Sequence, residues 1–190
     1  RRDPLPLFVL TPKSLLRNPA TASTAQELVE GRFRSVLDDA EAGVRAKSVK
    51  RVVLCSGKVY VDLISNERRK TATDVAVCRV EQLAPFPSVA LREVLDGYPS
   101  LRDVVWLQEE PENMGAWEYM RPQLEEMIGD RCPLRYIGRA RNSSPSEGSL
   151  AWHQLNQKTL ASLAFDLDVD ALPPSVVWSK PARSYAVAKQ

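Results

Sequence analysis

Short, nearly continuous apolar runs alternate with longer amphipathic segments along most of this chain. Runs in which consecutive residues are all apolar are typical of strands in a sheet that is covered on both faces. Strands that alternate with helices predict right-handed βαβ units and a mostly parallel sheet. The predicted strands, all rich in β-branched residues, are Leu7–Thr11, Arg51–Ser56, Asp74–Val80, Asp103–Leu107 and Arg135–Ile137.

The segments between these runs have helical spacing of apolar residues, so we expect an α/β fold with helices on both faces of the sheet, a Rossmann-like three-layer arrangement. Residues 27–46 lack one clean period, and a helix and an irregular insertion both remain open there. The predicted helices are Lys58–Lys70, Ser88–Gly97, Trp117–Ile128 and Ser149–Phe165, the last with an apolar stripe of Leu155, Leu160, Leu163 and Ala164.

The organisation predicted from this pattern is one domain over residues 1–165, followed by residues 166–190 as a tail or surface strap. The last segment loses helical and strand periodicity and contains three prolines. Chain ends with such composition are often poorly tied to the core.

Composition excludes several classes of function. The 26 Lys and Arg nearly balance the 24 Asp and Glu, giving a net charge of +2, so the basic excess of a nucleic-acid binder is missing. No apolar run approaches the roughly 20 residues that span a bilayer. Cys55, Cys78 and Cys132 lack CxxC spacing, so neither a zinc site nor a disulfide framework is expected, and small buried hydrophobes in a reducing compartment fit better.

Ligands of open parallel sheets gather beyond the carboxyl ends of the strands, so the loops there are the places to search. Ser56, Gly57 and Lys58 follow one predicted strand, and Arg79 ends the next. These four residues are a candidate anion or effector site. A plain tight turn at Gly57 and a local ion pair between Arg79 and Glu81 are the alternatives. The P-loop pattern and the GxGxxG pattern are both absent.

The paired carboxylates Glu109 and Glu110 resemble an acid–base or metal site at first sight. Side chains alternate along a strand, so neighbouring glutamates face apart, which argues against a carboxylate dyad. The chain contains one histidine, His153, and no serine or cysteine arrangement around it indicates a triad. We therefore predict no catalytic residue and no metal ligand.

We instead predict a structural loop after this strand. Asn113 is a turn former, and Trp117 would anchor the next helix. Arg139 and Arg141 follow the neighbouring strand, where they would either hold a phosphate or pair with Glu109 and Glu110. We expect the pairing, and with it a loss of stability in Glu110→Gln.

Several motifs taken together resemble a known family. They are LTPKSLLR (10–17), SGKVYVDL (56–63), RVEQLAPFP (79–87), QEEPENMGAW (108–117), RYIGRARNSSPSEGS (135–149) and HQLNQKTL (153–160). In order and spacing they resemble the C-terminal domain of the first, decarboxylating component of the 2-oxoglutarate dehydrogenase complex. Relatives that act on 2-oxoadipate are also similar. The resemblance covers roughly residues 5–165, and QEEPENMGAW and RVEQLAPFP are its most specific strings.

The resemblance implies a transketolase C-terminal-type fold inside an oxidoreductase that depends on thiamine diphosphate and magnesium. In the family, other domains hold that cofactor across a homodimer interface, with a GDG motif and an asparagine. The nearest string here is Gly129-Asp130-Arg131, so the resemblance implies that this chain alone binds no cofactor and is inactive.

The same resemblance implies partners and a compartment. The parent would decarboxylate 2-oxoglutarate oxidatively and pass the succinyl group to lipoyl, in the tricarboxylic acid cycle. Its partners would be dihydrolipoyl succinyltransferase and dihydrolipoyl dehydrogenase, in the bacterial cytoplasm or the mitochondrial matrix. Two alternatives remain: a free-standing regulatory module that binds a nucleotide or acyl-CoA at the strand ends, and a purely structural dimerisation domain.

Overall fold

The structure, a computed structural model, describes residues 5–167 and 176–178. The chain divides into two compact units, Arg1–Phe33 (unit 1) and Arg34–Gln190 (unit 2). Among the described residues, no helix is long and apolar enough to cross a membrane.

The described part of unit 1 consists of three short helices joined by loops. They are η1 (Lys13–Leu15), η2 (Pro19–Thr21) and α1 (Ala25–Glu30). The start of α1 is fixed by a capping box, in which the Thr24 hydroxyl accepts from the Glu27 backbone N–H and the Glu27 carboxylate accepts from the Thr24 N–H. Among the described residues of unit 1, no side chain is buried.

The prediction of a strand over Leu7–Thr11 is wrong for this chain. These residues have no regular secondary structure, and all their side chains are exposed. The physical reason is the lack of a partner, because the described part of unit 1 contains only short helices and no strand that could pair with this run.

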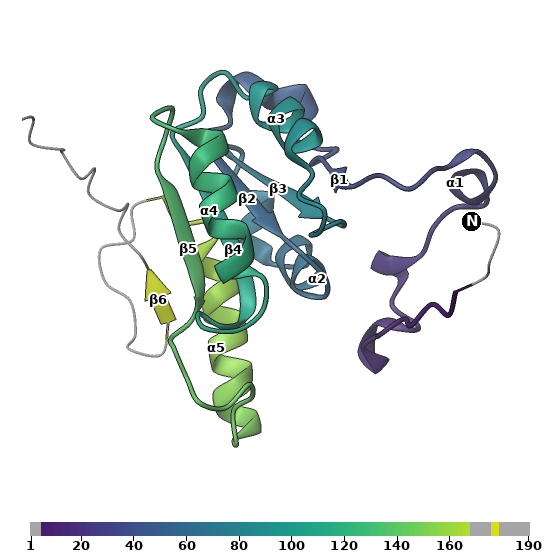
Figure 1. The fold of residues 1–190 in the computed structure, drawn as a ribbon, viewed down its shortest axis with the longest axis vertical. Coiled ribbons are helices and arrows are strands. Elements are labelled where there is room, and N and C mark those ends of the chain that lie inside the picture. The colour runs from purple at the N-terminus through teal and green to yellow at the C-terminus, as the bar shows by residue number, and fades with distance from the viewer. Residues whose placement is uncertain (1–4, 168–175, 179–190) are drawn as a thin grey trace, which may run out of the picture. The chain divides into compact units, whose positions relative to one another are not determined.

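Unit 2 contains a six-stranded sheet with the order β1-β3-β2-β4-β5-β6 (Figure 1). The four central strands are parallel, and the edge strands β1 and β6 are antiparallel to their neighbours. The α/β prediction with a mostly parallel sheet is therefore confirmed. The strands are β1 (Val36–Leu37), β2 (Arg51–Cys55), β3 (Val75–Val80), β4 (Asp103–Pro111), β5 (Leu134–Arg139) and β6 (Val176–Trp178).

Helices cover both faces of this sheet and create two hydrophobic cores. On one face, α3 (Ser88–Asp96) and α4 (Trp117–Ile128) pack on the even-numbered residues of β4, such as Trp106. On the other face, α2 (Val59–Ile64) and α5 (Leu150–Leu163) pack on the odd-numbered ones, such as Leu107. Central strands that are buried on both faces explain why the strand runs are apolar without alternation.

Three predicted elements differ in detail. The helix predicted over Lys58–Lys70 is divided into α2 and η4 (Glu67–Lys70), because the Asn66 side chain accepts from the Arg68 N–H and starts a new turn there. Leu155 is 52% exposed and is not part of the buried stripe of α5. Residues 27–46 are not one helix, because they contain the end of α1, the strand β1 and the start of η3 (Gly43–Ser48), joined by irregular segments.

A buried ion pair fixes this irregular segment to the sheet. The Asp39 carboxylate accepts from Arg69 Nη2 at 2.8 Å and Nη1 at 3.0 Å, and from the Val77 backbone N–H at 2.9 Å. Burial alone would raise the pKa of Asp39, but these hydrogen bonds lower it overall. No sequence pattern predicted this contact, which joins residues far apart along the chain.

Most of the predicted tail lies outside the described residues, namely 168–175 and 179–190. Val176–Trp178 are described and form β6, which pairs antiparallel with β5 at the edge of the sheet. Whether the rest is a tail or a strap stays a prediction.

Candidate functional site

Polar side chains from several elements of unit 2 meet at the carboxyl ends of the strands. We call this group the strand-end cluster. Its members come from the loop after β2, from α2, from the ends of β4 and β5 with the loop that follows, and from α5. They are Lys58, Asp62, Glu109, Arg139, Glu147, Asn156 and Gln157.

Lys58 is held between two carboxylates. Its ammonium Nζ lies 2.7 Å from Asp62 Oδ2 and 3.4 Å from Glu109 Oε2. The Gln157 amide donates to the same two oxygens, at 2.8 and 2.9 Å. Burial alone would lower the pKa of Lys58, but the Asp62 hydrogen bond and the Glu109 charge raise it overall. Lys58 is therefore a charged, already paired lysine.

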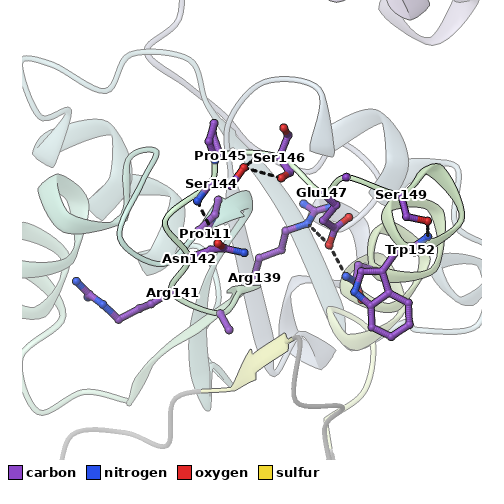
Figure 2. Close-up of a pocket in the computed structure, with 13 residues that line it drawn as sticks. Pro111, Arg139, Arg141, Asn142, Ser144, Pro145, Ser146, Glu147, Ser149 and Trp152 are labelled. Atoms are coloured by element: carbon purple, nitrogen blue, oxygen red, sulfur yellow. Dashed lines mark hydrogen bonds and ion pairs between the residues drawn. The ribbon is translucent and has the colours of Figure 1, made fainter.

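Arg139 is buried, and its guanidinium is shared among several acceptors. Its Nε donates to Glu147 Oε1 at 3.1 Å, its Nη2 donates to Gln157 Oε1 at 3.0 Å, and its Nη1 donates to the Glu109 backbone carbonyl. Asn156 also donates to Glu147. Although burial raises the pKa of Glu147, the hydrogen bonds from Asn156 and Arg139 lower it overall. Figure 2 shows Arg139 and Glu147 pointing toward one another.

An open pocket of about 580 Å³ lies beside this pair, between the end of β5 and the start of α5 (Figure 2). Asn142, Ser144 and Trp152 line it together with Arg141. Arg141 points away from Glu147 in Figure 2, and its Nη1 is 3.8 Å from Glu118 Oε1, with both side chains exposed. Since exposed pairs at this distance contribute little, Arg141 is only loosely held.

The four residues predicted to bind an anion do not form a free cationic site. Lys58 is paired as described, and Arg79 lies 3.4 Å from Glu81 and 4.4 Å over the ring of Tyr60. Gly57 has a φ of +72°, as a tight turn requires, and Ser56 beside it is half-buried. An anion would have to displace these partners, so binding at Ser56, Gly57, Lys58 and Arg79 stays a prediction.

The stretch QEEPENMGAW differs from the prediction, because β4 continues to Pro111 instead of ending at Leu107. Glu109 and Glu110 both lie within β4 and face apart, as strand alternation requires. The Glu109 carboxylate meets Lys58 and Gln157 rather than an arginine. Glu110 is exposed, and its carboxylate has no hydrogen bond or ion pair to any described residue. The expected pairing of these carboxylates with Arg139 or Arg141 is therefore wrong.

The Asn113 side chain joins the loop after β4 to the loop after β5. Asn113 Nδ2 donates to the Asn142 carbonyl at 2.9 Å, and the Asn142 N–H donates to Asn113 Oδ1 at 3.0 Å. Trp117 is buried at the start of α4, and its ring centroid is 4.9 Å from that of Tyr136 on β5. These contacts place Asn113 and Trp117 in structural positions.

Sequence reasoning missed Gln108, as it missed Asp62, Glu147, Asn156 and Gln157 of the strand-end cluster. Gln108 is buried, and its Oε1 accepts from the Trp106 indole at 3.0 Å and from the Trp117 backbone N–H at 3.0 Å. Its Nε2 donates to the Met114 carbonyl at 2.7 Å and to the Pro111 carbonyl at 3.1 Å. The available signal was a single amide two residues after Trp106, on the same strand face, at the end of an apolar run.

Cys55 and His153 differ in their surroundings. Burial raises the pKa of Cys55 to about 12, so its thiol stays protonated at neutral pH. His153 Nδ1 lies 3.5 Å from Glu147 Oε2 and 3.3 Å from Arg139 Nη2. In the described part of the chain, no three His, Cys, Asp or Glu side chains are placed to hold a metal ion.

The string Gly129-Asp130-Arg131 does not fit a diphosphate and its magnesium ion. Both Gly129 and Asp130 are exposed, and they connect α4 to β5 at the amino ends of the strands. A diphosphate with magnesium requires convergent oxygen ligands, which this turn does not offer. No step of a reaction is therefore assigned to thiamine diphosphate in this chain.

Comparison with known proteins gives a consistent result. Residues 22–165 match the family model described as 2-oxoglutarate dehydrogenase C-terminal. The 2-oxoglutarate dehydrogenase E1 component of Bacillus cereus (strain AH187) is 42% identical over 166 residues, which is 85% of this chain and 17% of the relative. The corresponding protein of Bacillus cereus (strain B4264) is 43% identical, and that of Bacillus anthracis (strain A0248) 42%, with the same coverage. The chain thus spans 17% of the length of these relatives.

Proposed function

The chain belongs to the 2-oxoglutarate dehydrogenase C-terminal family, and on that premise we propose that it is the C-terminal domain of a 2-oxoglutarate dehydrogenase E1 component. The observation that carries the proposal is identity of 42% over 85% of the chain to proteins of that name. The relatives are dehydrogenase components rather than free-standing regulatory modules, so the regulatory alternative has no support.

The role we propose for this domain is to complete the fold and the homodimer of the parent enzyme. Two features support it. The polar groups of the strand-end cluster pair with one another, which suits bracing rather than chemistry. In addition, Leu150, Trp152 and Leu155 on the first half of α5 are each more than half exposed, which suits a surface that another domain covers.

The structural loop has a defined part in this role. Glu109 links β4 to α2 and α5 through Lys58 and Gln157. Arg139 links β5 to α5 through Gln157. Asn113 ties the loop after β4 to the loop after β5. We propose that these contacts hold the carboxyl ends of the strands in a fixed shape for the neighbouring domain.

The chemistry of the parent would lie outside this chain. The parent would decarboxylate 2-oxoglutarate with thiamine diphosphate and magnesium held by its other domains. The succinyl group would then pass to the lipoyl group of dihydrolipoyl succinyltransferase, and dihydrolipoyl dehydrogenase would reoxidise that lipoyl group. The compartment proposed is that of the complex, the bacterial cytoplasm or the mitochondrial matrix.

The experiment that tests this proposal compares two substrates on the parent protein. We expect the parent to decarboxylate 2-oxoglutarate with a higher kcat/KM than 2-oxoadipate. A preference for 2-oxoadipate, or no activity with either acid, would overturn the proposed substrate. Calorimetry of the 190-residue chain with thiamine diphosphate and magnesium is the companion test, and saturable binding would contradict the domain assignment.

A further inference from the structure

The segment from Leu5 to Leu10 is almost wholly apolar, and its side chains are exposed. Leu7, Phe8 and Leu10 are 86%, 87% and 97% exposed, and Leu5 and Val9 are 63% and 71% exposed. Runs of the same character in unit 2, such as Val52–Leu54 and Val104–Leu107, are at most 1% exposed. A run of consecutive exposed apolar side chains is unusual on a protein surface and indicates a covered interface.

The backbone of this run is as unpartnered as its side chains. No hydrogen bond joins residues 7–11 to any other described residue. Pro6 and Pro12 lie directly before and after the run, and proline bounds a strand because it lacks the N–H that a ladder needs. The sequence between them therefore has the length and composition of one short strand.

The apolar residues in this run are consecutive rather than alternating, so both strand faces would be apolar. Such a strand belongs inside a sheet that is covered on both faces. Unit 1 offers no such sheet, because its described residues contain only η1, η2 and α1 and bury no side chain. A strand formed by residues 7–11 would therefore need neighbours outside unit 1.

We propose that residues 7–11 form a strand in a sheet that belongs to the part of the parent chain outside these 190 residues. This inference depends on the proposed function. The family match begins only at residue 22, so the run lies outside the C-terminal family unit. The relatives are long enough to hold further sheets, since this chain spans 17% of them.

A second copy of this chain is a poorer partner. Its sheet ends in β1 and β6, which are only two and three residues long. Edge strands that short would leave part of a five-residue run without hydrogen-bond partners. An intramolecular sheet of the parent offers both a longer neighbour and cover for both faces.

Hydrogen exchange tests the pairing directly. Peptides that contain residues 7–11 would be compared in the 190-residue chain and in the intact parent. We expect exchange in the parent to be slower, on the order of 100-fold, because strand amides become hydrogen bonded. Equally fast exchange in both would overturn the proposal. Protection that appears in the 190-residue chain as its concentration rises would identify a second copy as the partner and would also overturn it.

Substitutions test whether both faces are buried. Phe8→Asp and Val9→Asp point to opposite faces of a strand, so each should lower the Tm of the parent while leaving the Tm of the 190-residue chain unchanged. The matched control is Val44→Asp in the 190-residue chain, where Val44 is 97% exposed and no change in Tm is expected. Sensitivity at only one of the two positions would contradict a strand covered on both faces.

These results are separable from the proposed function. A parent that decarboxylates 2-oxoglutarate but leaves residues 7–11 unprotected refutes the strand alone. A parent that protects residues 7–11 but does not act on 2-oxoglutarate refutes the substrate alone.

Discussion

At the scale of single residues, Gln108 is the group on which the loop after β4 depends. The substitution Gln108→Met keeps a side chain of similar shape but removes the acceptor of two buried N–H groups, those of the Trp106 indole and the Trp117 backbone. Leaving them unpaired should destabilise the fold by about 2–4 kcal/mol. We expect thermal unfolding to show a Tm lower by roughly 5–15 °C for a chain of this size.

Glu110→Gln is the matched control in the same strand. Glu110 is exposed and its carboxylate has no described partner, so the change should alter stability by less than about 0.5 kcal/mol. This replaces the expectation that Glu110 braces the loop. If Glu110→Gln lowered the Tm as much as Gln108→Met, the contacts described for this loop would be wrong.

The Glu147 carboxylate should make stability depend on pH. Its pKa in the folded state is lowered from the ordinary value of 4.5, so its stabilising effect is complete above that pH and is lost as the pH falls through the folded pKa. We expect Glu147→Gln to be about 1–3 kcal/mol less stable than the unmodified chain at pH 7, since it removes a charged hydrogen-bond acceptor. Denaturant titrations at several pH values should show the difference shrinking below pH 4.5. A difference that grew in acid would contradict this assignment.

The directions of these side chains could be predicted from the sequence, but their contact partners could not, for a physical reason. Strand alternation separated Glu109 from Glu110 correctly, because it is a local property of the backbone. The partners of Glu109 were not predictable, because Lys58 reaches it from the loop after β2 and Gln157 from α5, both far from it along the chain. Gln108 was missed because an amide can satisfy several donors and acceptors at once, which no residue pattern reveals.

At the scale of elements, α5 shows the difference between periodicity and packing. Leu160 is fully buried against the sheet, whereas Leu155 in the same helix is 52% exposed. Leu160→Ala should destabilise the fold by about 2–5 kcal/mol through lost burial and a cavity. Leu155→Ala in the isolated chain should change stability by less than about 0.5 kcal/mol. Denaturant unfolding of both variants measures this, and equal effects would mean that α5 is packed differently.

Elements of unit 2 were predictable because their signals are local. The helix Trp117–Ile128 was predicted with the bounds that the structure gives, and β2 and β3 to within one residue, whereas β4 continues four residues beyond its predicted end at Leu107. The run Leu7–Thr11 has the same strand signal but forms no strand here. A strand needs a partner, and the sequence of the run shows its preference without showing where that partner lies.

At the scale of the whole molecule, the charged side chains at the strand ends have a structural role and no assigned role in catalysis. The parallel sheet brings the loops with charged side chains to one edge, where such folds place their ligands. Here those side chains neutralise one another, as Lys58 does with Asp62 and Glu109. We therefore propose that this domain supports an enzyme whose reacting groups lie in other domains.

The most direct test is the kcat of the parent enzyme for decarboxylation of 2-oxoglutarate in the variant Glu109→Gln. Glu109 is the carboxylate at the centre of the strand-end cluster, so it is the strongest candidate for an acid or base in this chain. We predict a kcat within about twofold of the unmodified parent and a lower Tm, because Glu109 contributes contacts rather than proton transfer. A general acid or base would instead contribute about 100-fold or more to kcat. A loss of kcat of that size with an unchanged Tm would contradict it.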